Sequence, residues 1–276
     1  MLQILSLMDD KHTRRKDLIA EHGLSLYVCY NGKRLLFDCG SSGSAIRNGE
    51  KLGVDLRNLD AVILSHSHYD HAAGFRFLIQ QGLGSRQLYT GPGFFVPKYS
   101  RNGMGYADLS AGFDRSFLEE KGIAHRQVDS CQEIFPGAYL ISGFPRTEAM
   151  EIIPQRFVRR TESGFAQDDF QDEVCLALET AEGLVLLVGC AHPGIVNMVR
   201  HVHAVLGTPV RCVFGGTHLV EADGQRVQRT IAALRAAGVK QLGLSHCSGE
   251  AAEAAVLEST DVQGCRLGPG DCVFFP

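Results

Sequence analysis

Apolar residues along the chain fall into short runs, and most of these runs end in a polar or glycine-rich stretch. Runs of this kind, bounded by turn residues, predict β-strands. The predicted strands are Gln3–Met8, Ser25–Tyr30, Arg34–Phe37, Ala61–Leu64, Gln87–Thr90, Ala138–Ser142, Val174–Glu179, Gly183–Val188, Val210–Phe214, Gln241–Leu244 and Cys272–Phe275. Asn31-Gly32 joins the second and third strands and favours a type I′ hairpin turn.

Helical spacing of apolar residues is clearest in three segments. They are Ala72–Gln81, Gly194–Leu206 and Val227–Ala237, and Gly238 suits the C-terminal cap of the last one. Between Gly91 and Gly112 the chain is rich in glycine and aromatic residues, with weak periodicity. This segment is predicted to be a loop, and a loop of that length is often a lid or a binding loop.

Hairpins near the start and strand–loop–helix units throughout predict an α/β fold. So many apolar strands are accounted for by two mixed sheets stacked on each other, with helices on the outside. We find no repeat, no low-complexity segment and no linker long enough to mark a domain boundary in the 276 residues. We therefore expect one domain over 1–276, with a candidate lid or substrate loop around 91–112.

Composition narrows the class of protein. The net charge of −4 leaves no basic footprint for nucleic acid, and no apolar run approaches the roughly 18 residues of a membrane span. The apolar N-terminus lacks a basic region and meets Asp9 and Asp10 at once, so it reads as a strand and not as a signal peptide. Nine cysteines without a CxxC pair favour a reducing compartment, and we expect a cytoplasmic protein. The oligomeric state stays open.

The strongest chemical signal is the run His66-Ser67-His68-Tyr69-Asp70-His71, directly after the strand Ala61–Leu64. His66 and His68 are two residues apart in extended backbone, so both side chains can point the same way. Asp70 and His71 begin the next helix and turn back over the loop. Imidazole nitrogens and a carboxylate in this arrangement suit zinc, iron or manganese, and the run predicts a metal site.

Three further histidines follow predicted strands in the same way, namely His192, His218 and His246. Groups placed at strand ends can gather on one edge of a sandwich. We expect His192 and His246 to be metal ligands, whereas His218 could bind substrate, donate a proton or ligate metal. The other histidines lack this placement and are expected to lie outside the site: His12, His22, His125, His201 and His203.

These motifs resemble the metallo-β-lactamase-fold superfamily with its HxHxDH signature. Asp38 matches an aspartate that closes an early strand in that family. The stretches Gly189–Asn197 and Phe214–Leu219 are similar to a branch labelled dihydropteroate-synthase-like or dihydropterin-ribofuranosylaminobenzene-phosphate synthase-like. The resemblance implies a four-layer αββα sandwich with the metals at one edge of the two sheets.

The resemblance also implies a site with two divalent metal ions, zinc above all, with iron or manganese as alternatives. The implied ligands are His66, His68, Asp70, His71, His192 and His246. Asp38 would support the metal loop through hydrogen bonds. Many members share a bridging aspartate between the two metals, but here Gly189 is followed by Cys190. Either Cys190 is a thiolate ligand, or it is a small buried residue and the bridge is absent or supplied elsewhere, with Asp168, Asp169 and Asp172 as candidates.

The function that follows is hydrolysis of an ester, amide, lactone or phosphate in a small molecule by metal-activated water. Asp70 would ligate the second metal and orient the nucleophile, and His218 is the candidate general acid. Four arginines could hold an anionic substrate group but fit solvated surface positions equally well: Arg146, Arg156, Arg159 and Arg160. The resemblance to the dihydropterin branch suggests a pterin-linked reaction.

Three alternatives remain. A redox member with two irons usually carries glutamate where this chain has Asp70, and it appends a flavin domain for which no chain remains. A nucleic-acid-processing member would need extra basic domains. A non-enzymatic ligand-binding or sensor protein on the same fold would be free to lose ligands, whereas the histidine set here is intact.

Overall fold

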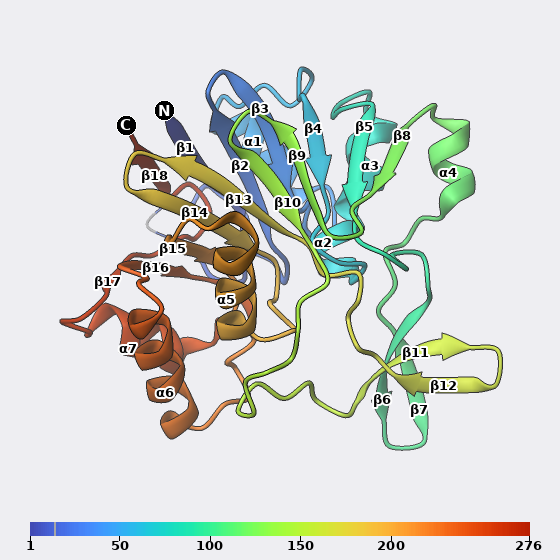
Figure 1. The fold of residues 1–276 in the computed structure, drawn as a ribbon. Coiled ribbons are helices and arrows are strands. Elements are labelled where there is room, and N and C mark those ends of the chain that lie inside the picture. The colour runs from blue at the N-terminus through green and yellow to red at the C-terminus, as the bar shows by residue number, and fades with distance from the viewer. Residues whose placement is uncertain (14) are drawn as a thin grey trace.

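The computed structural model describes residues 1–13 and 15–276, and their strands form three sheets (Figure 1). The first sheet has the order β18-β1-β2-β3-β4-β5-β8. Its strands are β1 (Leu2–Met8), β2 (Ser25–Tyr30), β3 (Lys33–Phe37), β4 (Ala61–Ile63), β5 (Gln87–Thr90), β8 (Ala124–Gln127) and β18 (Cys272–Phe275). Asn31 and Gly32 both have positive φ, as the predicted type I′ turn between β2 and β3 requires. From β3 to β8 the neighbouring strands are parallel.

The second sheet has the order β17-β16-β15-β14-β13-β10-β9. Its strands are β9 (Cys131–Phe135), β10 (Ala138–Ile141), β13 (Cys175–Thr180), β14 (Gly183–Val188), β15 (Val210–Gly215), β16 (Gln241–Leu244) and β17 (Gln263–Gly264). From β14 to β17 the strands are parallel, so their carboxyl ends lie at one edge of the sheet.

Three hydrophobic cores separate four layers. Side chains of both sheets, such as Leu35 and Leu187, form the middle core. Helices α1 (Ser44–Lys51), α2 (Tyr69–Ala72), α3 (Gly74–Gln80) and α4 (Arg115–Glu120) pack on the first sheet. Helices α5 (Ile195–Leu206), α6 (Gly224–Ala236) and α7 (Glu250–Leu257) pack on the second. The predicted αββα sandwich is therefore confirmed.

A third, four-stranded sheet lies beside the sandwich, at the lower right of Figure 1. It consists of two hairpins, β6 (Lys98–Asn102) with β7 (Gly105–Asp108), and β11 (Phe157–Thr161) with β12 (Gly164–Gln167). The prediction of an irregular loop over 91–112 is therefore wrong, because β6 and β7 lie within it. Every residue of β7 is exposed, so no apolar alternation marks the strand in the sequence. The role of this segment as a lid stays a prediction.

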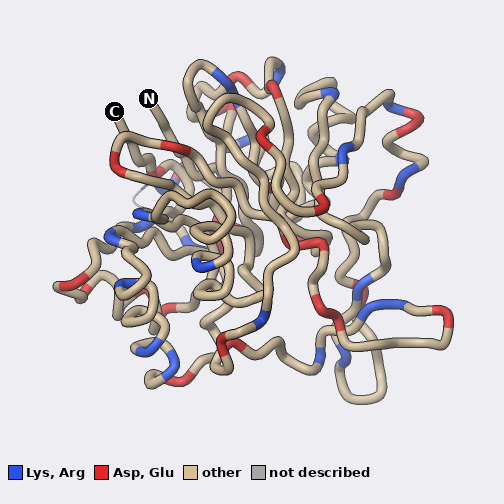
Figure 2. Tube along the Cα trace, viewed as in Figure 1, with Lys and Arg blue, Asp and Glu red and all other residues tan. Residues whose placement is uncertain are grey.

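The helix predicted over Ala72–Gln81 is divided, since α2 ends at Ala72 and α3 begins at Gly74. Gly74 packs directly on the chain before α1, where an added Cβ would lie 1.9 Å from the Cys39 carbonyl oxygen. Among the described residues, no helix is long and apolar enough to cross a membrane. Acidic and basic residues are interspersed along the trace in Figure 2.

Candidate metal centre

Parallel strands of both sheets bring the candidate residues to one edge of the sandwich. In each case the first functional residue lies one to three residues after the strand end, where the backbone leaves the sheet. The residues are Asp38 after β3, His66 to His71 after β4, Cys190 and His192 after β14, His218 after β15, and His246 after β16. The loop residues therefore converge although they are distant in sequence.

His66, His68 and His192 form a first group, the histidine triad. One ring nitrogen from each lies within 4.8 Å of the others. The Nε2 atoms of His66 and His68 and both ring nitrogens of His192 are buried without a hydrogen-bond partner among the described residues. Burial lowers the pKa of all three imidazoles well below the usual range, so they are neutral. A neutral imidazole with a free lone pair is the form that binds metal.

Asp70, His71 and His246 form a second group, the acidic triad. His246 Nε2 lies 3.1 Å from His71 Nε2 and 3.2 Å from Asp70 Oδ2, and the latter lies 3.7 Å from His71 Nε2. Burial opposes ionisation of Asp70, but the surrounding imidazoles lower its pKa well below the usual range. The acidic triad therefore offers a carboxylate and two imidazoles to one point.

The two triads adjoin, and Cys190 lies between them. The rings of His66 and His71 are 4.3 Å apart, and Cys190 Sγ lies 3.2 Å from His71 Nε2. Ligand atoms of His66, His71 and Cys190 lie within 4.8 Å of one another. Of the carboxylates considered as a bridge, Asp168 and Asp172 are instead occupied by Lys98 Nζ, at 3.0 and 2.5 Å.

Asp38 is fully buried behind the acidic triad. Its carboxylate accepts hydrogen bonds from the backbone N–H and the hydroxyl of Ser65, both at 2.7 Å, and lies 2.7 Å from His71 Nδ1. Because a carboxylate can only accept, the proton of His71 lies on Nδ1, and Nε2 keeps its lone pair for a metal. This is the hydrogen-bond support for the metal loop that the family resemblance implied for Asp38.

A second buried support connects the third sheet to the histidine triad. Lys98 on β6 pairs with Asp172, whose other oxygen accepts the backbone N–H of Ser67 at 2.9 Å. The ammonium group also lies 4.3 Å from the ring centre of Phe170, which stacks on His192 at 3.7 Å. The segment 91–112 therefore contacts the candidate site through Lys98.

Among the site residues that sequence reasoning missed are Asp10 and His22. Asp10 Oδ1 lies 2.6 Å from His246 Nδ1, and Asp10 Oδ2 lies 2.9 Å from His22 Nδ1. His22 Nε2 lies 3.2 Å from Asp70 Oδ2, so the expectation that His22 lies outside the site is wrong. Hydrogen bonds to Asp10 and Asp70 raise the pKa of His22 to about 10. Asp10 could have been found, because it follows β1 as the other site residues follow their strands.

His218 lies at the side of the histidine triad, with its ring 4.6 Å from that of His192. Its Nε2 lies 3.6 Å from Glu221 Oε1, and neither ring nitrogen has a hydrogen-bond partner among the described residues. Glu221 also pairs with Arg156. Of the other predicted anion-binding arginines, Arg146 donates to a backbone carbonyl and Arg159 lies 3.6 Å from Asp169. Because these three guanidinium groups already have partners in the protein, they are less available to bind an anionic substrate group.

Backbone strain is concentrated at this edge. Among the described non-glycine residues, six have positive φ, a conformation that costs energy outside glycine. Five of the six lie at or against the candidate site: Asp38, Phe170, Ala191, His218 and His246, with φ between 48 and 59°. Strain of this kind is kept where the surrounding structure needs a particular side-chain direction.

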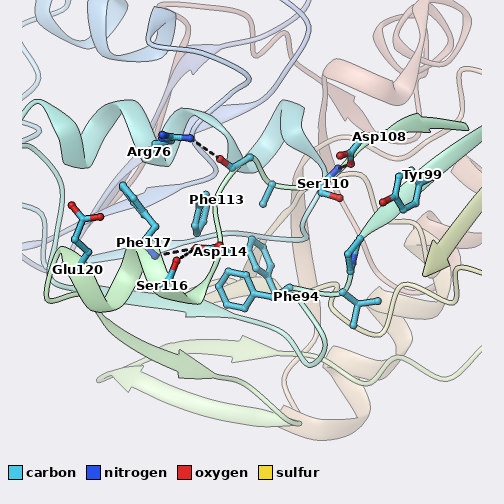
Figure 3. A pocket seen from close by; sticks show the side chains of 15 residues that line it. Arg76, Phe94, Tyr99, Asp108, Ser110, Phe113, Asp114, Ser116, Phe117 and Glu120 are labelled. Atoms are coloured by element: carbon cyan, nitrogen blue, oxygen red, sulfur yellow. Dashed lines mark hydrogen bonds between the residues drawn. The ribbon is translucent and has the colours of Figure 1, made fainter. Parts of the chain in front are cut away.

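A pocket of about 600 Å³ lies between α3, α4 and the segment before β6 (Figure 3). Its lining combines phenyl rings with charged groups: Phe94, Phe95, Phe113, Phe117, Arg76, Asp108, Asp114 and Glu120. One wall is tied to the metal loop, because the backbone N–H of Tyr69 donates to the carbonyl of Leu109 at 2.8 Å. The predicted substrate segment therefore borders a cavity as well as the candidate metal centre.

Comparison with known proteins places this geometry in a family. The model of the metallo-beta-lactamase superfamily matches residues 19–82, which include the HxHxDH run. A 7,8-dihydropterin-6-methyl-4-(beta-D-ribofuranosyl)-aminobenzene-5'-phosphate synthase of Methanocaldococcus jannaschii is 30% identical over 286 aligned residues. The match covers 99% of this chain and 97% of the synthase.

Two further matches agree. An uncharacterised protein of Methanocaldococcus jannaschii is 27% identical to this chain. The match covers 80% of this chain and 81% of that protein. A solved structure described as a metal-dependent hydrolase of the beta-lactamase superfamily has 25% identity and a TM-score of 0.84. That match covers all of this chain and 99% of the other. The protein described here belongs to the metallo-beta-lactamase superfamily.

Proposed function

We propose that this protein is a metal-dependent hydrolase acting on an ester, phosphate or related bond of a small molecule. The observation that carries the proposal is the pair of adjoining triads, which present six imidazole or carboxylate groups at one edge of the sandwich. An ordinary polar cluster would satisfy its buried nitrogens with hydrogen bonds, whereas the histidine triad leaves its converging nitrogens without partners.

The donor atoms fit a pair of divalent ions, with zinc preferred and iron or manganese as alternatives. The histidine triad would hold one ion and the acidic triad the other. Bound at these positions, divalent ions lower the pKa of water towards 7 and polarise a carbonyl or phosphoryl oxygen. Side chains of the protein would then orient the substrate and accept or donate protons.

Asp70 has a proposed role in addition to binding metal, and Asp38 has a proposed role in orienting a metal ligand. Asp70 is buried and ionised, so it can accept a hydrogen bond from the attacking water and orient it. Asp38 holds the ring of His71 in the tautomer that leaves Nε2 free. The role of His218 as proton donor stays a prediction from its place beside the histidine triad.

The test is a substrate panel assayed with metal-loaded protein and with the His66→Ala/His68→Ala double variant. The panel comprises aryl phosphodiesters, lactones, β-lactams and pterin phosphates. We expect turnover of at least one compound and its loss in the double variant, with circular dichroism to verify that the variant is folded. Turnover that survives in the folded double variant, or that is unaffected by chelation, would contradict the proposal.

The full-length similarity to the Methanocaldococcus synthase favours a second candidate, a pterin-linked synthase reaction. The two candidates differ in the bond that changes. Incubating the protein with a dihydropterin and a phosphorylated ribosyl-aminobenzene compound, followed by mass spectrometry, detects a coupled product if the synthase candidate is right. Hydrolysed fragments alone would support the hydrolase.

A further inference from the structure

Three neighbouring parallel strands each end in a side chain that neither triad contains. β14, β15 and β16 pair in register, with Val188 opposite Gly215 and Gly215 opposite Leu244. Cys190 follows β14 by two residues, while His218 and Cys247 follow β15 and β16 by three. Because the strands end level, the three side chains meet at the same height above the sheet edge.

The three ligand atoms are close enough for one ion. Cys190 Sγ, Cys247 Sγ and a ring nitrogen of His218 lie within 4.8 Å of one another. Ligand atoms around a tetrahedral zinc ion, with Zn–S bonds of about 2.3 Å, are about 3.7 Å apart. The present spacing therefore exceeds that around a bound ion by at most about 1.1 Å.

The backbone packs closely around the side chain of Cys247. The backbone N–H of His218 donates to Cys247 Sγ at 3.2 Å, and the Cys247 thiol lies 3.8 Å from the Cys190 carbonyl oxygen. A Cβ on Gly216 would lie 2.6 Å from Cys247 Sγ, so only glycine at this position leaves room for the sulfur. Both ring nitrogens of His218 lack hydrogen-bond partners among the described residues, although they are buried.

We propose that Cys190, His218 and Cys247 form a third cation site, for a thiophilic ion such as Zn²⁺, beside the two triads. Two thiolates and an imidazole are a donor set that zinc prefers, and the thiolates also balance the charge of the ion. Glu221, 3.6 Å from His218 Nε2, would orient the ring from behind, as carboxylates do in many zinc sites. His218 is then a ligand, one of the roles left open by its position, and Cys190 lies between this site and the acidic triad.

The test compares zinc content after loading under reducing conditions and desalting, measured by elemental analysis. We expect Cys247→Ser and His218→Asn each to hold one ion fewer per chain than the unmodified protein. Cys212→Ser is the matched control, because this buried cysteine lies on β15 in the core between the sheets and should not alter the content. With Co²⁺ as probe, the sulfur-to-cobalt absorption should fall to about half in Cys247→Ser, since one of two thiolates is lost.

Unchanged zinc content and unchanged cobalt absorption in a folded Cys247→Ser variant would overturn the proposal. A Cys190–Cys247 disulfide found by peptide mapping, with no additional zinc bound after reduction, would also overturn it and make the pair a redox couple. Neither readout measures hydrolysis. A catalytically inactive protein that still holds the additional ion would therefore refute only the proposed function.

Discussion

Replacing Asp38 by asparagine keeps the shape of the side chain and removes its charge. In the native protein, Oδ1 accepts the backbone N–H of Ser65, while Oδ2 accepts the Ser65 hydroxyl and faces His71 Nδ1. The backbone N–H of Ser65 cannot turn away, so the asparagine oxygen must stay opposite it. The new amide NH₂ group then points at His71 Nδ1, which has to become an acceptor. The proton moves to Nε2, the atom that the metal needs.

The expected effect has two parts. Two hydrogen bonds to a buried carboxylate oxygen, each contributing about 1.5–3 kcal/mol, are lost and partly replaced, so the free energy of unfolding should fall by about 2–4 kcal/mol. The wrong tautomer of His71 should weaken metal binding at the acidic triad by about 10–100-fold, in line with other residues that orient metal ligands. Binding at the histidine triad should change much less, because Asp38 does not contact those rings.

The assay is a competition titration of zinc against a chromogenic chelator, combined with guanidinium unfolding of the metal-free protein. Asp60→Asn is the control. Asp60 lies at the opposite end of β4 and accepts the backbone N–H of Arg34 at 2.9 Å, so its loss should leave zinc affinity unchanged. If the Asp38 variant folds and keeps the native affinity of both ions, the tautomer argument is refuted.

Three further predictions rest on the same structure. Lys98→Met leaves Asp168 and Asp172 buried without their cation, so the free energy of unfolding in denaturant titrations should fall by about 3–5 kcal/mol, and an unchanged value would contradict the buried ion-pair assignment. The imidazoles of the histidine triad have folded-state pKa values below the 6.5 of the unfolded chain, which therefore binds more protons below that pH. Each imidazole should consequently lower the stability of the metal-free protein in urea as the pH falls below about 6.5, by up to about 1.4 kcal/mol per pH unit, and the raised pKa values of the buried Asp9 and Glu173 carboxyls offset part of this loss. Stability that instead rises as the pH falls from about 6.5 to 5 would contradict the burial of the imidazoles. Gly74→Ala places a Cβ against the Cys39 carbonyl and should lower the midpoint of thermal unfolding, by the equivalent of about 1–3 kcal/mol, and an unchanged midpoint would refute the close contact.

Most of the sandwich could be predicted from the sequence because most of its strands are nearly continuous apolar runs. All six residues of β14, for example, are buried, and its predicted bounds are those observed. The strands β8, β9 and β17 were missed, because most of their residues are polar or partly exposed. Strands outside the sandwich give no such signal. β6 and β7 carry glycine, lysine, arginine and aspartate on a mostly exposed hairpin, and only pairing with β11 shows that they are strands.

A residue of the site could be predicted from the sequence where it closely follows an apolar strand. His66 and His246 were found in this way. His22 was not, because it comes from an irregular segment that reaches the acidic triad only through the tertiary fold. Cys247 gives no sequence signal either, since buried cysteines are common in ordinary cores and only its distance from Cys190 distinguishes it.

The central claim is that each of the two triads binds one ion. Anomalous scattering at the zinc absorption edge, recorded from crystals of zinc-loaded protein, tests it most directly. The account predicts one peak within bonding distance of His66, His68 and His192, and a second within bonding distance of Asp70, His71 and His246. Well-ordered crystals of zinc-loaded protein in which one or both triads lack a peak would contradict it.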